Sequence, residues 1–257
     1  GAPVPPGADR VLMLEKSSVD VGRLVPSAVP QEGENICFRG EDMRRGLLVL
    51  PRGSLLDSKA AGVAAMAGRA SLRVYRRPVL SILTTGNEVV APGALPGPGQ
   101  VRNANMPMLH SLASACGFEV ARSLHAEDSL RETTAAAGAL LASSDVLIAA
   151  GGISLGVHDH VAPALEAAGT GFLFREVALK PGKPFSFGMA GDRPVFCLPG
   201  NPVSVFCTFL EFVTPALRRM SGHERCSRTR LQGICRFEHR QRRGRTNLLR
   251  VIAIRDQ

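Results

Sequence analysis

The sequence of 257 residues has no tryptophan, a single tyrosine and only 5% aromatic residues. This scarcity argues against a nucleic-acid reader built on aromatic stacking platforms. No apolar run approaches the roughly 20 residues that a membrane-spanning helix needs, so we expect no membrane span. Hydrophobic residues make up 45% of the chain and charged residues 21%, which excludes a disordered or collagen-like chain.

Positive charge is concentrated at one end of the sequence. Residues 223–257 hold ten arginines and three acidic residues, and so carry most of the net charge of +9. Such a segment either forms a solvated face or contacts an acidic partner, an anionic ligand or nucleic acid. We do not expect nucleic-acid binding, because the charge lies away from the glycine-rich loops described below.

The six cysteines include no CxxC pair, which argues against a zinc site or a thioredoxin-like redox motif. Cys197 and Cys207 lie in apolar runs and are expected to be small buried side chains. The first residues, GAPVPPGAD, have neither the basic start nor the apolar core of a signal peptide. We therefore expect a cytoplasmic protein with reduced thiols.

The sequence divides into four stretches with different residue patterns, of which the longest, 78–222, is described in the next paragraph. Residues 1–53 are rich in turns, with short apolar runs at 11–14 and 47–50 that predict strands of a small β-rich domain. Residues 54–77 form a linking segment whose alanine-rich part predicts a helix ending near Gly68. Residues 223–257 form a basic segment, in which 248–254 predicts a strand.

Residues 78–222 alternate between strand and helix patterns. The predicted strands are 79–83, 119–124, 145–150, 172–179 and 193–198, and the predicted helices are 106–116, 130–142, 160–168 and 203–220. This alternation predicts an α/β domain with a mainly parallel sheet flanked by helices. Its ligand is then expected at the edge where the strands end.

A glycine-bearing loop follows four of the predicted strands, at 84–88, 151–156, 180–184 and 199–202. Glycine lets backbone amides approach an anion closely, and the third loop adds two lysines. Four such loops at one edge predict a site for a phosphorylated ligand. The kinase phosphate loop and the dinucleotide fingerprint are both absent, so a standard kinase, GTPase or NAD enzyme is not expected.

Three carboxylates lie beside these loops: Glu88, Asp128 and Asp159. Magnesium prefers oxygen ligands and often bridges a carboxylate to a substrate phosphate, so these acids predict a metal at the site. Asp128 has an alternative role, because it precedes the predicted helix 130–142 and is suited to cap it.

Two weaker patterns surround the second loop. Residues 152–156 (GISLG) match the G-x-S-x-G string of a hydrolase nucleophile, but the histidines that follow lie in the basic segment. His158 and His160 flank Asp159, yet residues two apart do not share a helix face, so exposed turn histidines are the simpler interpretation.

Five segments carry a resemblance to a known family: 84–88 (TTGNE), 99–105 (GQVRNAN), 151–159 (GGISLGVHD), 179–188 (LKPGKPFSFG) and 198–205 (LPGNPVSV). With the opening GAPVPPGADRVLMLE and with 33–46 (GENICFRGEDMRRG), they resemble the molybdopterin molybdenumtransferase family, MoeA and the gephyrin E-domain. The resemblance runs almost end to end in the family's motif order.

The resemblance implies a cytoplasmic homodimer that works in molybdenum cofactor biosynthesis. It implies transfer of molybdenum from molybdate to adenylylated molybdopterin with Mg²⁺, release of AMP, and contact with the molybdopterin adenylyltransferase. It implies that 223–257 is part of a C-terminal β-barrel-like domain. The acidic active-site positions would be Asp42, Glu88, Asp128 and Asp159, the last three also as metal ligands. The ligand contacts predicted from the loops and the resemblance are Thr85, Gly86, Gly151, Gly152, Ser154, Lys180, Gly182, Lys183, Pro199, Gly200, Asn201 and Ser204.

Two departures from the family's pattern concern whole segments of the chain. The M-D-G-Y-A motif is absent, and the C-terminal domain is shorter. From these departures we expect weak ligand binding and slow turnover beside a full-length relative. The alternatives are a molybdopterin adenylyltransferase built on the same α/β domain and a non-enzymatic scaffold like gephyrin. The GEN…RGED segment and the basic segment argue against the adenylyltransferase, because a stand-alone version needs neither.

Overall fold

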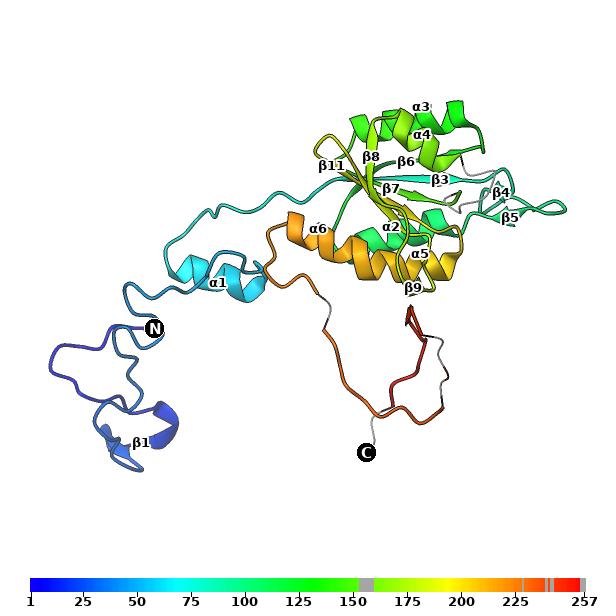
Figure 1. Cartoon of the computed structure of the whole chain (residues 1–257). Coiled ribbons are helices and arrows are strands. Elements are labelled where there is room, and N and C mark those ends of the chain that lie inside the picture. The colour runs from blue at the N-terminus through cyan, green and yellow to red at the C-terminus, as the bar shows by residue number, and fades with distance from the viewer. Residues whose placement is uncertain (153–159, 228, 239, 241–242, 255–257) are drawn as a thin grey trace.

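The computed structural model describes residues 1–152, 160–227, 229–238, 240 and 243–254. Its main body is a six-stranded sheet with strand order β6-β3-β7-β11-β10-β8 (Figure 1). The strands are β3 Leu80–Thr85, β6 Val120–Ala126, β7 Val146–Ala150, β8 Thr170–Phe174, β10 Ser186–Ala190 and β11 Arg193–Leu198. The first four in the sheet order run parallel, and β10 is antiparallel to both of its neighbours. The predicted mainly parallel sheet is confirmed.

Helices cover both faces of this sheet (Figure 1). One face packs against α2 (Asn105–Ala115), α5 (Pro202–Thr208) and α6 (Thr214–Met220). The other packs against α3 (Leu130–Ala142) and α4 (Val161–Ala167). The predicted helix 203–220 is interrupted by a π-helical turn at Phe209–Val213. In the described part of the chain, no helix is both long and apolar enough to cross a bilayer.

The alternation of side chains along a strand explains why both faces need a cover. All six residues of β3 are buried. Leu80 and Ile82 belong to the core beneath α2 and α5, and Leu83 belongs to the core beneath α3. A strand that is apolar on both sides is stable only between two helical layers, which fixes the three-layer arrangement.

The N-terminal segment differs from the prediction. Its strands are β1 (Ser17–Asp20) and β2 (Arg23–Pro26), an antiparallel pair that follows a 3₁₀ turn at Leu14–Lys16. The predicted strands 11–14 and 47–50 are wrong, because these short apolar runs have no partner strand and most of their residues are exposed. The helix of the linking segment is confirmed as α1 (Ser58–Met66), which Asp57 caps by accepting from the Ala60 amide and which ends before Gly68.

Two further strand predictions are wrong. The run 172–179 is not one strand: β8 ends at Phe174, and β9 (Leu179–Lys180) pairs with β12 (Thr246–Asn247) instead. The sheet has an irregular register at Phe187 and Gly188, opposite the point where β8 ends. Residues 248–254 form no strand, since no neighbouring strand takes up their exposed apolar side chains. Within the described part of 223–254, β12 is the one strand, so the barrel-like domain is not confirmed.

The sequence patterns also missed β10 and the short pair β4 (Val89–Val90) and β5 (Val101–Arg102). A pair of two-residue strands carries too little periodicity to be recognised in a sequence. This pair nevertheless matters, because it lies just beyond the end of β3 (Figure 1).

Candidate functional site

A cavity of about 400 Å³ lies at the carboxyl ends of β3, β7 and β11. Parallel strands bring these three ends to the same sheet edge, where ligands of open α/β sheets bind. The lining comes from the loop after β3, the β4–β5 pair, the start of α2, and the loops after β6, β7 and β11. Its predicted site residues are Thr85, Gly86, Glu88, Asp128, Gly151, Gly152 and Gly200.

Glycine is required where the loops touch one another. Gly151 has a φ of +108°, and a Cβ there would lie 2.7 Å from the Thr85 carbonyl oxygen. A Cβ on Gly152 would lie 2.6 Å from Val161 Cγ2, and one on Gly200 would lie 3.6 Å from Gly151 Cα. A side chain at Gly151 would therefore clash with the backbone of the loop after β3 and one at Gly152 would clash with Val161, whereas a Cβ at Gly200 would make only an ordinary contact.

Asp128 is held in the cavity by the neighbouring loop. The Asn87 amide donates to Asp128 Oδ2 over 3.1 Å, and the Asp128 amide donates to Asn87 Oδ1 over 2.9 Å. The cap of α3 is Ser129, whose Oγ accepts from the Glu132 amide. The alternative role of Asp128 as the helix cap is therefore wrong, and Asp128 lines the cavity instead.

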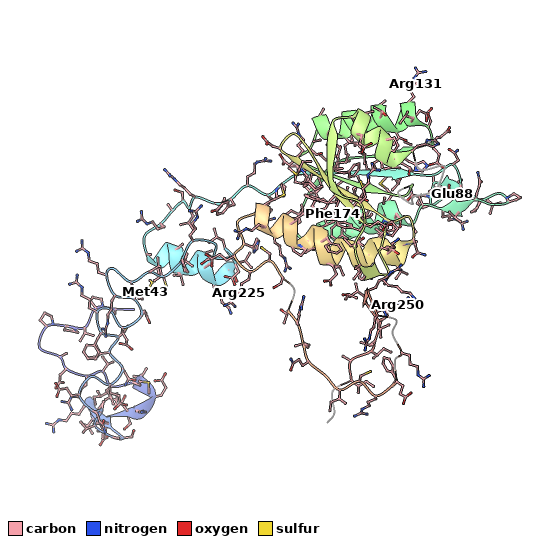
Figure 2. The ribbon with its side chains drawn as sticks, viewed as in Figure 1. Met43, Glu88, Arg131, Phe174, Arg225 and Arg250 are labelled. Atoms are coloured by element: carbon pink, nitrogen blue, oxygen red, sulfur yellow. The ribbon has the colours of Figure 1, made fainter. Side chains whose placement is uncertain are left out.

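Glu88 lies on the same wall, labelled in Figure 2. Its carboxylate folds back over Gly86, where a Cβ would lie 2.8 Å from Glu88 Oε2. The Val101 amide donates to the Glu88 carbonyl over 2.8 Å, so the β4–β5 pair holds this residue in place. Two carboxylates from loops 40 residues apart in the chain thus share one small cavity.

Two buried oxygens at the cavity have no hydrogen-bond partner within the described residues: Thr85 Oγ1 and Asn105 Oδ1. Asn105 is oriented by its other amide atom, since Nδ2 donates to the Gly200 carbonyl over 2.8 Å. Buried polar atoms are nearly always paired in folded proteins, so unpaired ones at a cavity indicate a ligand or an ion. The sequence patterns missed Asn105 as a site residue, although it ends the 99–105 segment that contributes to the resemblance.

The third glycine-bearing loop, 180–184, lies elsewhere. Gly182 has a φ of +115° and packs against Thr208 of α5, and Lys183 pairs with Glu176 over 2.9 Å. Lys180 lines a different cavity, of about 530 Å³, together with Arg250. Three of the four loops therefore meet, and the lysine-bearing loop does not line their cavity.

The remaining predicted ligand contacts belong to the loop after β11 and to the first turn of α5. Pro199 is buried. Asn201 caps α5 by accepting from the Val203 amide over 3.0 Å. The buried Ser204 accepts from Thr208 Oγ1 at its carbonyl oxygen. These residues shape the loop that carries Gly200, and they do not line the cavity.

Three of the other predicted residues lie apart from the cavity or outside the described residues. Asp42 is adjacent to Met43, which lies at the far end of the molecule from Glu88 (Figure 2). Ser154 and Asp159 fall in 153–159, outside the described residues, as do His158 and the GISLG string beyond Gly152. Among the described residues, no group of three or more His, Cys, Asp or Glu side chains is placed to hold a metal ion.

Comparisons with known proteins agree with this architecture. Residues 81–219 match the family of the probable molybdopterin binding domain, and residues 1–68 match the MoeA N-terminal region (domain I and II). The chain is 31% identical over 223 residues to a molybdopterin molybdenumtransferase of Staphylococcus aureus (strain Mu50), covering 86% of the chain and 53% of that protein. It is 30% identical over 226 residues to the enzyme of that name from Staphylococcus epidermidis (strain RP62A), covering 88% of the chain and 54% of that protein.

A solved structure of a MoeA molybdopterin biosynthesis protein from Pyrococcus horikoshii superposes with a TM-score of 0.70 at 29% identity. That match covers 87% of the chain and 56% of the archaeal protein. The chain thus spans about half the length of the relatives that it matches. A domain match over more than half of its residues, together with these relatives, establishes that the chain belongs to the MoeA family.

Proposed function

We propose that this chain acts in molybdenum cofactor biosynthesis as a molybdopterin molybdenumtransferase, transferring molybdenum from molybdate to adenylylated molybdopterin with release of AMP. The observation that carries the proposal is the cavity in which the glycine-rich ends of β3, β7 and β11 meet Glu88 and Asp128. Relatives that bear this enzyme's name support the choice of reaction.

The cavity residues suit a magnesium ion. Glu88 and Asp128 are carboxylates, and Thr85 Oγ1 and Asn105 Oδ1 are oxygens without a partner among the described residues. Hard cations prefer such oxygen ligands and complete their shell with water and substrate phosphate. We infer that Glu88 and Asp128 hold the ion, with Asp159 as the predicted third acid. A bound magnesium would supply Lewis acidity at the phosphate.

The chain's own groups would bind and orient the adenylylated end. Glycine backbone at Gly151, Gly152 and Gly200 leaves room for a phosphate to approach the loops closely. Asn105 is fixed by Gly200 and presents an oxygen to the cavity. These walls would displace water from a bound phosphate, so that the charged and polar groups of the cavity would act on it more strongly than they do in water.

Molybdate is an oxyanion, so we expect positively charged side chains to bind it. We infer that Lys180, with Arg250 across the same cavity, attracts it from the side of α5. Lys183 already pairs with Glu176, so its contribution would depend on breaking that ion pair. Gly182 and Ser204 would then have a structural role, because they hold the backbone beside the cavity that Lys180 and Arg250 line.

Asp42 would reach such a site only from a second copy of the chain, because its neighbour Met43 lies far from Glu88 within one chain (Figure 2). The proposal therefore includes a homodimer. It also includes the cytoplasm as the location and receipt of the substrate from the molybdopterin adenylyltransferase.

The test is to incubate the chain with adenylylated molybdopterin, molybdate and Mg²⁺ and to measure AMP, with the Staphylococcus aureus relative as a positive control. The proposal predicts AMP only when all three are present. AMP formation that does not need molybdate would contradict it. Formation of adenylylated molybdopterin from ATP and molybdopterin would favour the adenylyltransferase instead.

A further inference from the structure

A cavity of about 540 Å³ lies apart from the candidate site, where the linking segment meets the residues that follow α6. Its walls come from residues 50–56, from the end of the linking segment at 72–77 and from residues 221–223, and we call it the linker groove. Leu55 and Val74 in these walls are 65% and 67% exposed. Apolar side chains that gather in one exposed hollow, unlike single ones, indicate an interaction surface.

The walls of the linker groove are joined by Tyr75. Arg52 Nε donates to the Tyr75 hydroxyl over 2.7 Å, and the Arg52 guanidinium carbon lies 5.6 Å from the centre of the Tyr75 ring. The backbone of Gly222 lies so close to the same ring that a Cβ there would overlap it. One side chain thus connects all three segments, so the groove is already formed in this chain.

The side chains of the linker groove carry charge of one sign. Arg52, Arg73 and Arg77 line it, and none of its lining residues is Asp or Glu. None of these arginines forms an ion pair within the described part of the chain. At the border of the groove, Glu224 packs against Gly53 and adds one negative charge beside the three positive ones. A binding partner with carboxylates would complement this charge.

The linking segment also has unused backbone hydrogen-bonding groups. Residues 70–77 form no backbone–backbone hydrogen bond with any described residue. The chain runs from α1 to β3 here without helix or strand (Figure 1). Val74 and Tyr75 favour a strand, and Pro78 biases the residue before it toward an extended backbone. Exposed, unpaired N–H and C=O groups of this kind are a template to which another strand can add.

We propose that the linker groove binds an extended acidic segment of a partner protein, which adds as a strand along residues 70–77. Its main chain would pair with the linking segment, its apolar side chains would contact Leu55 and Val74, and its carboxylates would face Arg73 and Arg77. A nucleic acid would match the arginines but would leave the apolar walls uncovered. The inference does not depend on the proposed reaction.

The experiment is fluorescence anisotropy of the full chain with a labelled valine–glutamate peptide (VEVEVEVE), which matches the length of residues 70–77. The comparison probes are a valine–lysine peptide (VKVKVKVK) and an octathymidylate oligonucleotide. The variant Arg73→Glu reverses one charge of the groove at an exposed position. The matched control is Arg131→Glu, which is exposed on α3 and outside the groove (Figure 2).

We expect the glutamate peptide to bind about tenfold more tightly than the lysine peptide, and Arg73→Glu to remove about that whole difference. Arg131→Glu should leave both affinities unchanged. Two further peptides carry N-methyl groups on all valines or on all glutamates. Because a strand pairs with one neighbour through the amides of every second residue, one methylated peptide should lose binding and the other should keep it.

Several results would overturn the inference. These are no binding of the glutamate peptide, equal binding of the lysine peptide or the oligonucleotide, equal effects of Arg73→Glu and Arg131→Glu, and equal behaviour of the two methylated peptides. A second copy of this chain is the other possible occupant. If sedimentation velocity shows a dimer that Arg73→Glu dissociates and that the glutamate peptide does not, the groove joins two copies and the inference is wrong.

Discussion

The first 59 residues and the sheet body differ in how much of their side-chain surface they bury. No residue before Ala60 is buried, and Leu14 and Val21 are 79% and 95% exposed. In the sheet body, every residue of β3 and β7 is buried. The body therefore has a core of its own, whereas the N-terminal segment has apolar side chains that bury little within this chain. A contact with another surface, such as the proposed homodimer would supply, would bury more of them.

The sharpest way to test this comparison is to remove the same side chain in both regions. Leu83→Ala in β3 leaves a cavity between the sheet and α3, so we expect a loss of about 2–5 kcal/mol in the free energy of unfolding. Leu24→Ala in β2 removes a side chain that is 56% exposed, and we expect a change below about 0.5 kcal/mol. Urea denaturation of both variants measures the difference, and similar losses would contradict the comparison.

A second pair of variants compares the site edge with a helix surface of the same body. Gly151→Ala places a Cβ 2.7 Å from a carbonyl oxygen at a φ of +108°, and we expect a loss of about 1–3 kcal/mol. Gly138→Ala lies in α3 with nothing within 4 Å, and we expect a gain of about 0.5–1 kcal/mol. Thermal unfolding measures whether each variant is less or more stable than the unmodified chain. A stabilising Gly151→Ala would contradict the close contact with the Thr85 carbonyl oxygen.

A third variant tests how the linking segment is anchored to the sheet. Arg76 donates two hydrogen bonds to Asp145, which also accepts from the Val79 amide. The hydrogen bonds from Arg76 lower the pKa of the Asp145 carboxyl. Asp145→Asn should cost about 1 kcal/mol at neutral pH, a modest amount because water screens the exposed arginine.

The lowered pKa of Asp145 also determines how its contribution to stability depends on pH. The stability that the charged carboxylate contributes is full above its ordinary pKa of about 3.9, and it is lost as the pH falls through the lower pKa of the folded state. The gap between the unmodified chain and Asp145→Asn should therefore shrink in acid. Asp20→Asn, on exposed β1, is the control. A gap that widens as the pH falls would contradict the ion pair.

The sheet body could be predicted because its patterns are local and strong. The helix over 130–142 was predicted with its observed bounds from its Ala-rich spacing, although its cap is Ser129 and not Asp128. The strand 193–198 was likewise predicted with its observed bounds, and three glycine-bearing loops meet as expected from parallel strands. Repeated strand–helix units determine which edge the loops share.

The wrong predictions concern segments whose structure depends on contacts with residues distant in the sequence. Residues 248–254 have strand propensity but no partner, and the segment after Phe174 leaves the sheet for β9 and β12. Asn105 and the Asn87–Asp128 pair were missed as site features because their roles depend on loops distant in sequence. The lysine-bearing loop was expected at the same cavity, yet Gly182 packs on Thr208 of α5.

The central claim is that the reaction requires the carboxylates of Glu88 and Asp128, which lie at the ends of the parallel strands. The most direct test is the AMP-release rate of Asp128→Asn, whose amide oxygen can still accept from Asn87 while the charge is removed, beside Asp192→Asn on an exposed turn. The account predicts a fall of about 100-fold for Asp128→Asn and none for Asp192→Asn. Equal rates for the two variants, with both folded, would contradict it.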